Sequence, residues 1–362
     1  MADLTIPTEP IGSIPRPKTL LKAIEAKQGC ATDPSLEPLY EAAVKDTIEQ
    51  FEATGSPVVT DGEQRKYHNF WTYAVHGSPN TSADGFKIPF AAGHTRRMPR
   101  LHTKPFRYQR YADQYLSEAL RYTRRPLKQA VISPSALSLL YPAQGIADYP
   151  REQFISDLLQ EHVTEVRRCL EKGAVTVQID FTEGRLAMKI DPSGLLLSRF
   201  VELNNLALAR FSIAERRRLG VHTCPGGDLD STHSADVDYA ELLPSLFLLD
   251  VRNFYVALAS ERDRAYVLRM IRDRLKPHQR VFVGVVSPIS ARIETPEEVR
   301  DRILEAARYI PIEQLGTTDD CGFAPFCDDE STSRETAFAK IKSRVQGTAL
   351  AAAELGGTVD QR

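Results

Sequence analysis

Short runs of apolar, β-branched residues recur along the chain, and each is followed by a stretch with the period of an amphipathic helix. Eight such runs predict strands, around residue 11 and at 57–60, 130–133, 175–180, 220–222, 254–259, 281–286 and 314–317. The stretches between them predict helices at 20–27, 39–54, 114–122, 151–171, 197–218, 239–248, 263–275, 296–307 and 334–355. Strands that alternate with helices pair in parallel, and strands that are apolar throughout are covered on both faces. The pattern therefore predicts an α/β protein, a single (β/α)8 TIM barrel.

One long stretch interrupts this alternation after the second predicted strand. From about residue 67 to about residue 110 the chain is rich in His, Pro, Gly and Arg and has no clear period. Trp71, the only tryptophan, lies here, where it either packs against neighbours or forms the floor of a pocket. No hydrophobic pattern in this stretch suffices for a separate core. We therefore expect one domain over residues 1–362, with an irregular excursion at 67–110.

Composition and charge bear on which classes of binding partner the protein has. The formal net charge is -2, so no global basic field favours nucleic acid or anionic lipid, and short arginine runs are expected on solvated faces. No segment has the roughly 18 consecutive apolar residues of a membrane span. The first ten residues, MADLTIPTEP, lack the basic flank and apolar run of a secretion signal. Five scattered cysteines indicate a reducing compartment. We expect a cytoplasmic protein without a nucleic-acid or membrane partner.

Candidate chemistry lies where predicted strands end, because the working residues of such barrels come from the C-terminal ends of strands. The fifth strand ends in His222 and Cys224, and residues two apart on an extended segment share a face. The eighth ends near Cys321, at the same mouth of the barrel. Two thiolates and one imidazole suit tetrahedral Zn²⁺. The alternative is a buried thiol beside a hydrogen-bonded histidine, and the placement at two strand ends leaves both interpretations open.

Five ordered motifs then carry a family resemblance across nearly the whole chain. They read IGSIPRP at 11–17, DGE at 61–63, QID at 178–180, HTC at 222–224 and DCGF at 320–323. The chain resembles the catalytic half of cobalamin-independent methionine synthase and the shorter single-barrel proteins related to it. In that family a His, two Cys and a Glu bind zinc, which takes homocysteine as a thiolate for methyl transfer from a methylated folate. The resemblance thus implies a zinc-dependent S-methyltransferase of methionine biosynthesis acting on a small thiol.

Carried over by position, the resemblance makes His222, Cys224 and Cys321 zinc ligands. Glu261 is the candidate for the fourth ligand, although some single-barrel relatives have their Glu nearer the position of Ala257. The alternative is that Glu261 is an acidic residue at a helix start, where it favours the helix dipole.

The resemblance also implies a binding site for the thiol's amino-acid group. The segment of Gly12 and Ser13 resembles the one whose backbone N–H groups hold the substrate carboxylate. Glu63 and Asp180 resemble the carboxylates that hold its ammonium group, a role that charge-assisted hydrogen bonds suit.

The chain departs from the family pattern after Asp180. Methionine synthases continue with Glu and Pro, whereas this chain reads FTEGR at 181–185. We expect Glu183 and Arg185 to be new polar groups of the pocket wall, with Arg185 pairing with an acidic group of the substrate or, alternatively, forming an internal ion pair. The N-terminal barrel of the two-barrel enzymes is also missing. We therefore expect a folate polyglutamate to be a poor donor and a smaller one, such as a methylated corrinoid, to be better.

Two other functions stay open. The shortened architecture is also similar to epoxyalkane:coenzyme M transferase, in which a zinc-bound thiolate opens an epoxide. Either reaction needs a proton for the leaving group, and His233 or Asp319 is the candidate acid. His233 alternatively caps the helix that begins near Asp236. A non-catalytic barrel stabilised by zinc is the remaining alternative, although a structural site usually has four clear protein ligands.

Overall fold

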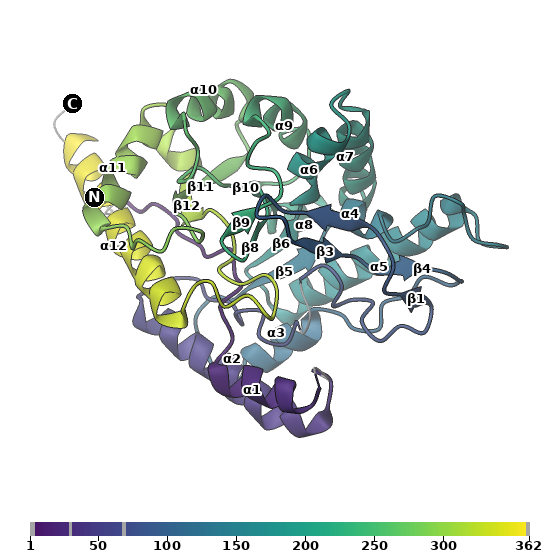
Figure 1. Ribbon diagram of the computed structural model, residues 1–362. Helices are drawn as coiled ribbons and strands as arrows, with labels where there is room; N and C mark the ends of the chain where they lie inside the picture. The colour runs from purple at the N-terminus through teal and green to yellow at the C-terminus, as the bar shows by residue number, and fades with distance from the viewer. Residues whose placement is uncertain (1–3, 29–30, 67–69, 360–362) are drawn as a thin grey trace.

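Six parallel strands form the centre of the protein in a computed structural model that describes residues 4–28, 31–66 and 70–359 (Figure 1). They lie in the order β12, β11, β10, β7, β6, β5. Their bounds are β5 Lys128–Ile132, β6 Thr176–Asp180, β7 Leu219–Thr223, β10 Asn253–Val256, β11 Arg280–Val286 and β12 Leu315–Asp319. Almost every residue in these strands is buried, as expected for parallel strands covered on both faces.

Two further segments close the ring between β12 and β5. Thr8 forms a parallel bridge to Thr317 of β12, and Val59 forms one to Leu127, directly before β5. The two segments meet where the backbone N–H of Ile14 donates to the carbonyl of Gly62 at 3.0 Å. The predicted barrel is confirmed, but the predicted strands around residue 11 and at 57–60 are wrong as strands, because each is a single bridge. Prolines at positions 7, 10 and 57 have no N–H to donate to a ladder.

Helices surround these strands on the outside (Figure 1). Their bounds are α1 Lys18–Ala26, α2 Glu37–Ala53, α3 Asp113–Ala119, α4 Pro134–Ser138, α5 Arg151–Lys172, α6 Glu183–Ile190, α7 Leu195–Leu208, α8 Ile213–Arg216, α9 Tyr239–Leu246, α10 Arg264–Arg274, α11 Pro296–Ala307 and α12 Arg334–Val359, with short 3-10 turns at Pro34–Leu36 and Ile312–Gln314. The predicted helix at 197–218 is two helices, because Ser212 and Glu215 form a capping box that starts α8. The short helices α4 and α6, which follow β5 and β6, were not predicted.

The excursion is more ordered than its sequence indicates. Its start, residues 67–69, lies outside the described residues. From residue 70 on, it contains two antiparallel ladders, β1 Thr81–Ser82 with β4 Arg100–Leu101 and β2 Lys87–Pro89 with β3 Thr95–Arg97. Phe70, Ile88 and Phe106 belong to the same buried cluster as the barrel core.

The turn between β2 and β3 contacts the loop after β7. The backbone N–H of Ala91 donates to the carbonyl of Thr232 at 2.9 Å. Thr232 belongs to β9 Ser231–Thr232, which pairs with β8 Gly227–Asp228. The excursion therefore covers the side of the barrel on which β7 ends.

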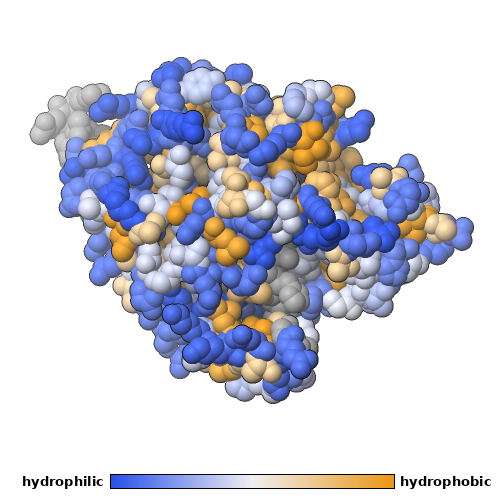
Figure 2. Space-filling view, viewed as in Figure 1, coloured by the Kyte–Doolittle hydropathy of each residue, from blue (hydrophilic) through white to orange (hydrophobic). Residues whose placement is uncertain are grey.

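In the view of Figure 2 the face is mostly hydrophilic, with hydrophobic residues in separate small patches. None of the helices in the described ranges has the length and apolar composition that crossing a bilayer requires.

Candidate functional site

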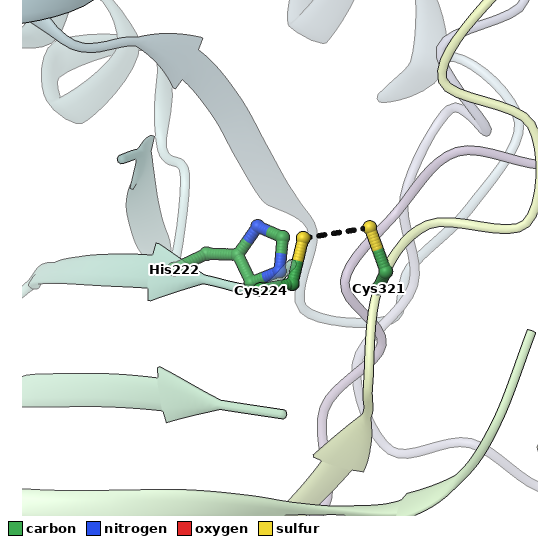
Figure 3. Close-up of side chains that lie close together, drawn as sticks. All are labelled: His222, Cys224 and Cys321. Carbon is green, nitrogen blue, oxygen red and sulfur yellow. Dashed lines mark hydrogen bonds between the residues drawn. The ribbon is translucent and has the colours of Figure 1, made fainter. Parts of the chain in front are cut away.

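Three side chains from two distant parts of the chain meet beyond the ends of β7 and β12 (Figure 3). The nearest potential ligand atoms of His222, Cys224 and Cys321 all lie within 4.8 Å of one another, and all three residues are buried. The two sulfur atoms are 3.0 Å apart, although the cysteines are separated by 97 positions in sequence. The expected arrangement, with a His and a Cys on one strand end and a second Cys from the eighth strand, is therefore present.

The imidazole of His222 is oriented by the neighbouring strand. Asp180, the last residue of β6, is the register partner of His222, and its Oδ1 lies 3.0 Å from Nδ1 of the ring. The other nitrogen, Nε2, is buried and has no hydrogen-bond partner among the described residues. A histidine that ligates a metal typically donates its second ring N–H to a carboxylate, which fixes the tautomer and the ring orientation. The donor set and this free Nε2 fit a zinc ion.

The cluster holds protons that a metal ion would displace on binding, because burial raises the pKa of the Cys224 thiol and His222 is also readily protonated. Burial opposes the charged form of His222, but its hydrogen bond to Asp180 and its contact with Cys321 outweigh this and raise its pKa to about 9. The pKa of the Cys321 thiol is lowered, because the Cys224 thiol bonds to it and His222 adds to the effect against the opposing burial. A thiolate beside an imidazolium is the form from which a metal displaces a proton.

A cavity opens beside the cluster. His222 and Cys321 form part of its wall, together with the carboxylates of Glu63 and Asp180 and the ring of His233. The remaining lining includes the aromatic residues Phe70, Trp71, Phe90 and Phe326. A small pocket with a few polar groups is the usual form of a small-molecule site.

The first and last barrel segments pack tightly at the rim of this cavity. Ser13 lines it, its carbonyl accepts from the N–H of Phe323 at 2.9 Å, and its Oγ accepts from the N–H of Ala324 at 3.3 Å. A Cβ at Gly322 would lie 2.0 Å from the Ser13 Oγ, so only glycine permits this approach. Gly12 has a φ of 148°, and its carbonyl accepts from Thr60.

Glu63 and Asp180, the carboxylates that we expect to hold the substrate ammonium, both line the cavity. Burial raises the pKa of Glu63 to about 7, with a further contribution from Asp180, and the nearby Lys66 opposes the rise. The ammonium of Lys66, buried below the site, lies 3.3 Å from the Glu63 carboxylate. Nothing in the sequence marks Lys66 as a site residue, because most lysines lie on the protein surface.

The comparison with known proteins decides the family. The pattern of the family described as "Cobalamin-independent synthase, Catalytic domain" matches residues 6–346. The chain belongs to this family.

Individual relatives match nearly the whole length of the chain. The chain is 26% identical over 359 residues to methionine synthase of Sulfurisphaera tokodaii, an alignment that covers 97% of this chain and 94% of that protein. It is 26% identical over 361 residues to methionine synthase of Saccharolobus solfataricus, covering 97% and 96%. Its fold is similar to that of a B12-independent methionine synthase from Shewanella sp. W3-18-1, with a TM-score of 0.75, 17% identity, and coverage of 97% of this chain and 99% of that one.

Membership of the cobalamin-independent synthase family confirms the prediction of a methyltransferase of the methionine synthase type. It gives no support to the methylated corrinoid that we expected as donor, because the family is defined as independent of cobalamin.

In the segment that departs from the family pattern, Thr182 lines the cavity, but Glu183 and Arg185 do not. Burial raises the pKa of Glu183 to about 7, and its carboxylate accepts hydrogen bonds from Ser133 and Ser135. Arg185 is buried and donates to Glu261 at 2.7 Å and to the carbonyl of Val237 at 2.6 Å. Arg185 forms an internal ion pair, but its partner is Glu261 and not the Glu183 or nearby Asp that the sequence offered as alternatives.

Glu261 lies outside the metal cluster, because its carboxylate is occupied by Arg185 and its oxygens are not among the grouped ligand atoms. Ala257 packs directly against Cys224 and Cys321 and has no ligand atom. The described residues thus supply three protein ligands to the cluster.

The two candidate acids have different surroundings. His233 lines the cavity, and burial together with Lys189 and Arg185 lowers its pKa to about 3. Its Nδ1 lies 2.8 Å from the Oγ of Ser234, and Asp238, not His233, caps α9, so the capping interpretation is wrong. Asp319 pairs with Arg344 of α12 at 3.1 Å and accepts from the N–H of Ile11 at 3.3 Å.

Asp319 is not among the residues that line the cavity, so the structure does not bring it to the thiol site. Phe70, Phe90 and Phe326 line the cavity together with Trp71. Their positions in the sequence follow no helical or strand period, so the sequence alone does not identify them as a group.

Proposed function

We propose that the protein is a zinc-dependent methyltransferase that binds homocysteine or a closely similar amino-acid thiol at His222, Cys224 and Cys321. The observation that carries the proposal is the free Nε2 of His222, held by Asp180 toward two cysteine sulfurs. Zinc at these ligands supplies the positive charge that keeps a substrate thiol ionised near neutral pH. With three protein ligands, a fourth position is left for the substrate sulfur, which supports a catalytic rather than a structural site.

The carboxylates of the cavity support an amino-acid thiol as the substrate. Glu63 and Asp180 offer two acceptors to an ammonium group. Ser13 lies in the cavity wall next to Gly12 in sequence, and the backbone N–H groups of these two residues are candidates to hold the carboxylate. Among the described residues that line the cavity, none is Lys or Arg. A sulfonate thiol such as coenzyme M needs such a cation, so the cavity favours methyl transfer over the epoxide-opening alternative.

The remaining site residues have supporting roles in this proposal. Asp180 fixes the ring of His222, and His233, which is neutral near pH 7, forms a wall of the cavity. Arg185 and Glu261 hold the loop after β7 in place. We further propose that residues 1–362 work as one catalytic domain, with the excursion covering the mouth of the barrel.

Metal analysis tests the site. We expect about one zinc per chain in purified protein and the loss of most of it in Cys224→Ser and in Cys321→Ser. Cys327→Ser is the matched control, because Cys327 is a free cysteine on the loop after β12 and is not part of the cluster. Equal zinc in all four proteins would contradict the assignment.

Cobalt substitution tests the thiol. A cobalt-loaded enzyme develops stronger sulfur-to-metal charge-transfer absorption when one more thiolate binds. We expect homocysteine to produce this change and coenzyme M to produce much less. The reverse order would favour the epoxide-opening function.

A further inference from the structure

Four aromatic side chains form one side of the cavity, and we call Phe70, Trp71, Phe90 and Phe326 the aromatic wall. Three belong to the excursion, and Phe326 belongs to the loop after β12. The ring centroids of Trp71 and Phe326 are 5.2 Å apart at an interplanar angle of 88°, and those of Phe90 and Phe326 are 6.4 Å apart at 82°. Rings that meet at right angles present both faces and edges, and aromatic faces attract cations.

The charges around the wall also favour a positive ligand. Glu63 and Asp180 line the same cavity, and no Lys or Arg does so among the described residues. Arg96 lies over the Phe326 ring at 4.3 Å but is paired with both Asp228 and Asp328.

Two further cations lie behind the cavity. Lys66 is paired with Glu63, and Lys189 with Asp236. Arg16 is also buried nearby and donates to the carbonyls of Phe326 and Glu63. Of the charged side chains that line the cavity itself, Glu63 and Asp180 are the acidic ones, so the lining favours a positive ligand.

The cavity has little acid to offer a leaving group. A methyl group on a neutral nitrogen leaves only if that nitrogen gains a proton. His233 is deprotonated near neutral pH, and Asp319 lies outside the cavity, paired with Arg344. Glu63 does line the cavity, and its pKa is raised to about 7 even beside Lys66, but in the proposed function its carboxylate holds the substrate ammonium.

We propose that the methyl donor is a small onium compound, a sulfonium or a quaternary ammonium, whose methyl-bearing cationic centre docks on the aromatic wall. This inference rests on the proposed function, because the zinc-bound thiolate is the acceptor. The thiolate electron pair forms the new S–CH₃ bond, and the electrons of the breaking bond stay on the departing sulfur or nitrogen. The negative thiolate and the positive donor give two uncharged centres, a thioether and a sulfide or amine, so no proton and no oxidant is required.

The test compares donors with deuterated methyl groups on the zinc-loaded enzyme with homocysteine. The donors are S-methylmethionine, glycine betaine and 5-methyltetrahydrofolate triglutamate, and labelled methionine is measured by mass spectrometry. We expect labelled product from an onium donor and at least about tenfold less from the folate, the scale of one desolvated cation–π contact. Faster transfer from the folate, or no product from either onium donor, would overturn the inference.

Variants of the aromatic wall test whether the onium donor binds there. Trp71→Leu and Phe90→Leu should each raise the KM for the onium donor about tenfold. Phe106→Leu is the matched control, a buried excursion ring that packs on Phe154 away from the cavity, and should leave this KM unchanged. Equal KM values in all these variants that fold would also overturn the inference.

The cobalt–thiolate absorption separates the two proposals. It should persist in every wall variant, because the thiol binds at the metal. If homocysteine gives the absorption change but no onium donor reacts, only the donor inference fails. If homocysteine gives no change in the wild type, the proposed function fails and the inference falls with it.

Discussion

Asp180 Oδ1 lies 3.0 Å from Nδ1 of His222, and the two residues are register partners at the ends of adjacent strands. The same carboxylate oxygen also accepts from the side chain of Gln178 at 2.8 Å. Asp180 therefore has two tasks in the proposed function, because it orients a metal ligand and faces the cavity in which the substrate ammonium is expected.

Asp180→Asn should weaken zinc binding about 10- to 100-fold, the range found when a partner of a ligating histidine is lost. The affinity is measured by competition with a chromogenic chelator. Glu183→Gln is the control, because Glu183 is also a buried acid but bonds to Ser133 and Ser135. If both variants bind zinc as the wild type does, Asp180 does not hold the ligand.

Gly226→Ala should disrupt the site, whereas Gly227→Ala should not. Gly226 has a φ of +71°, its N–H donates to Cys224 Sγ at 3.3 Å, and an added Cβ would lie 1.9 Å from Nε2 of His233. At Gly227 the nearest atom to an added Cβ is 3.9 Å away, on Ile289. We expect lower zinc content and a lower Tm for the first variant only, by metal analysis and calorimetry.

Variants of Arg185 and Glu261 test whether Glu261 is the fourth zinc ligand. Arg185→Ala leaves the carbonyls of Ala235 and Val237 without their donor and should cost about 3 kcal/mol in the free energy of unfolding. Glu261→Gln should be milder, because an amide still accepts from Arg185. If Glu261 serves Arg185, this variant retains its zinc; loss of zinc with little change in unfolding would instead make Glu261 a ligand.

Glu183 should leave a signature in the pH dependence of stability. Burial raises its pKa from 4.5 to about 7, so between these values the folded protein holds a proton that the unfolded chain has released. The contribution of Glu183 to stability therefore falls as the pH rises through this window. Glu183→Gln cannot titrate and should gain more stability relative to the wild type at pH 7 than at pH 5, by urea unfolding. An equal difference at both pH values would contradict the raised pKa.

The sequence predicted the barrel because its signal is local. Each strand and helix has its own period of apolar residues, and the order of the elements limits how parallel strands can be joined. The pairing of His222 with Cys224 follows from their spacing on one strand. The same local signal failed at residues 7–11 and 57–60, where prolines interrupt the hydrogen bonding that a periodic pattern predicts.

The surroundings of the cluster depended on contacts between distant segments. Arg185 forms an ion pair with Glu261, 76 positions away, and Asp319 forms one with Arg344. Arg185 and Asp319 were both predicted to lie in the pocket, and neither lines the cavity. The aromatic wall joins rings from the excursion and the loop after β12. The sequence by itself determined which elements form and which residues end them. Only the tertiary structure decided which charge is paired and which side chain faces the cavity, because burial and partners are set by how the segments pack.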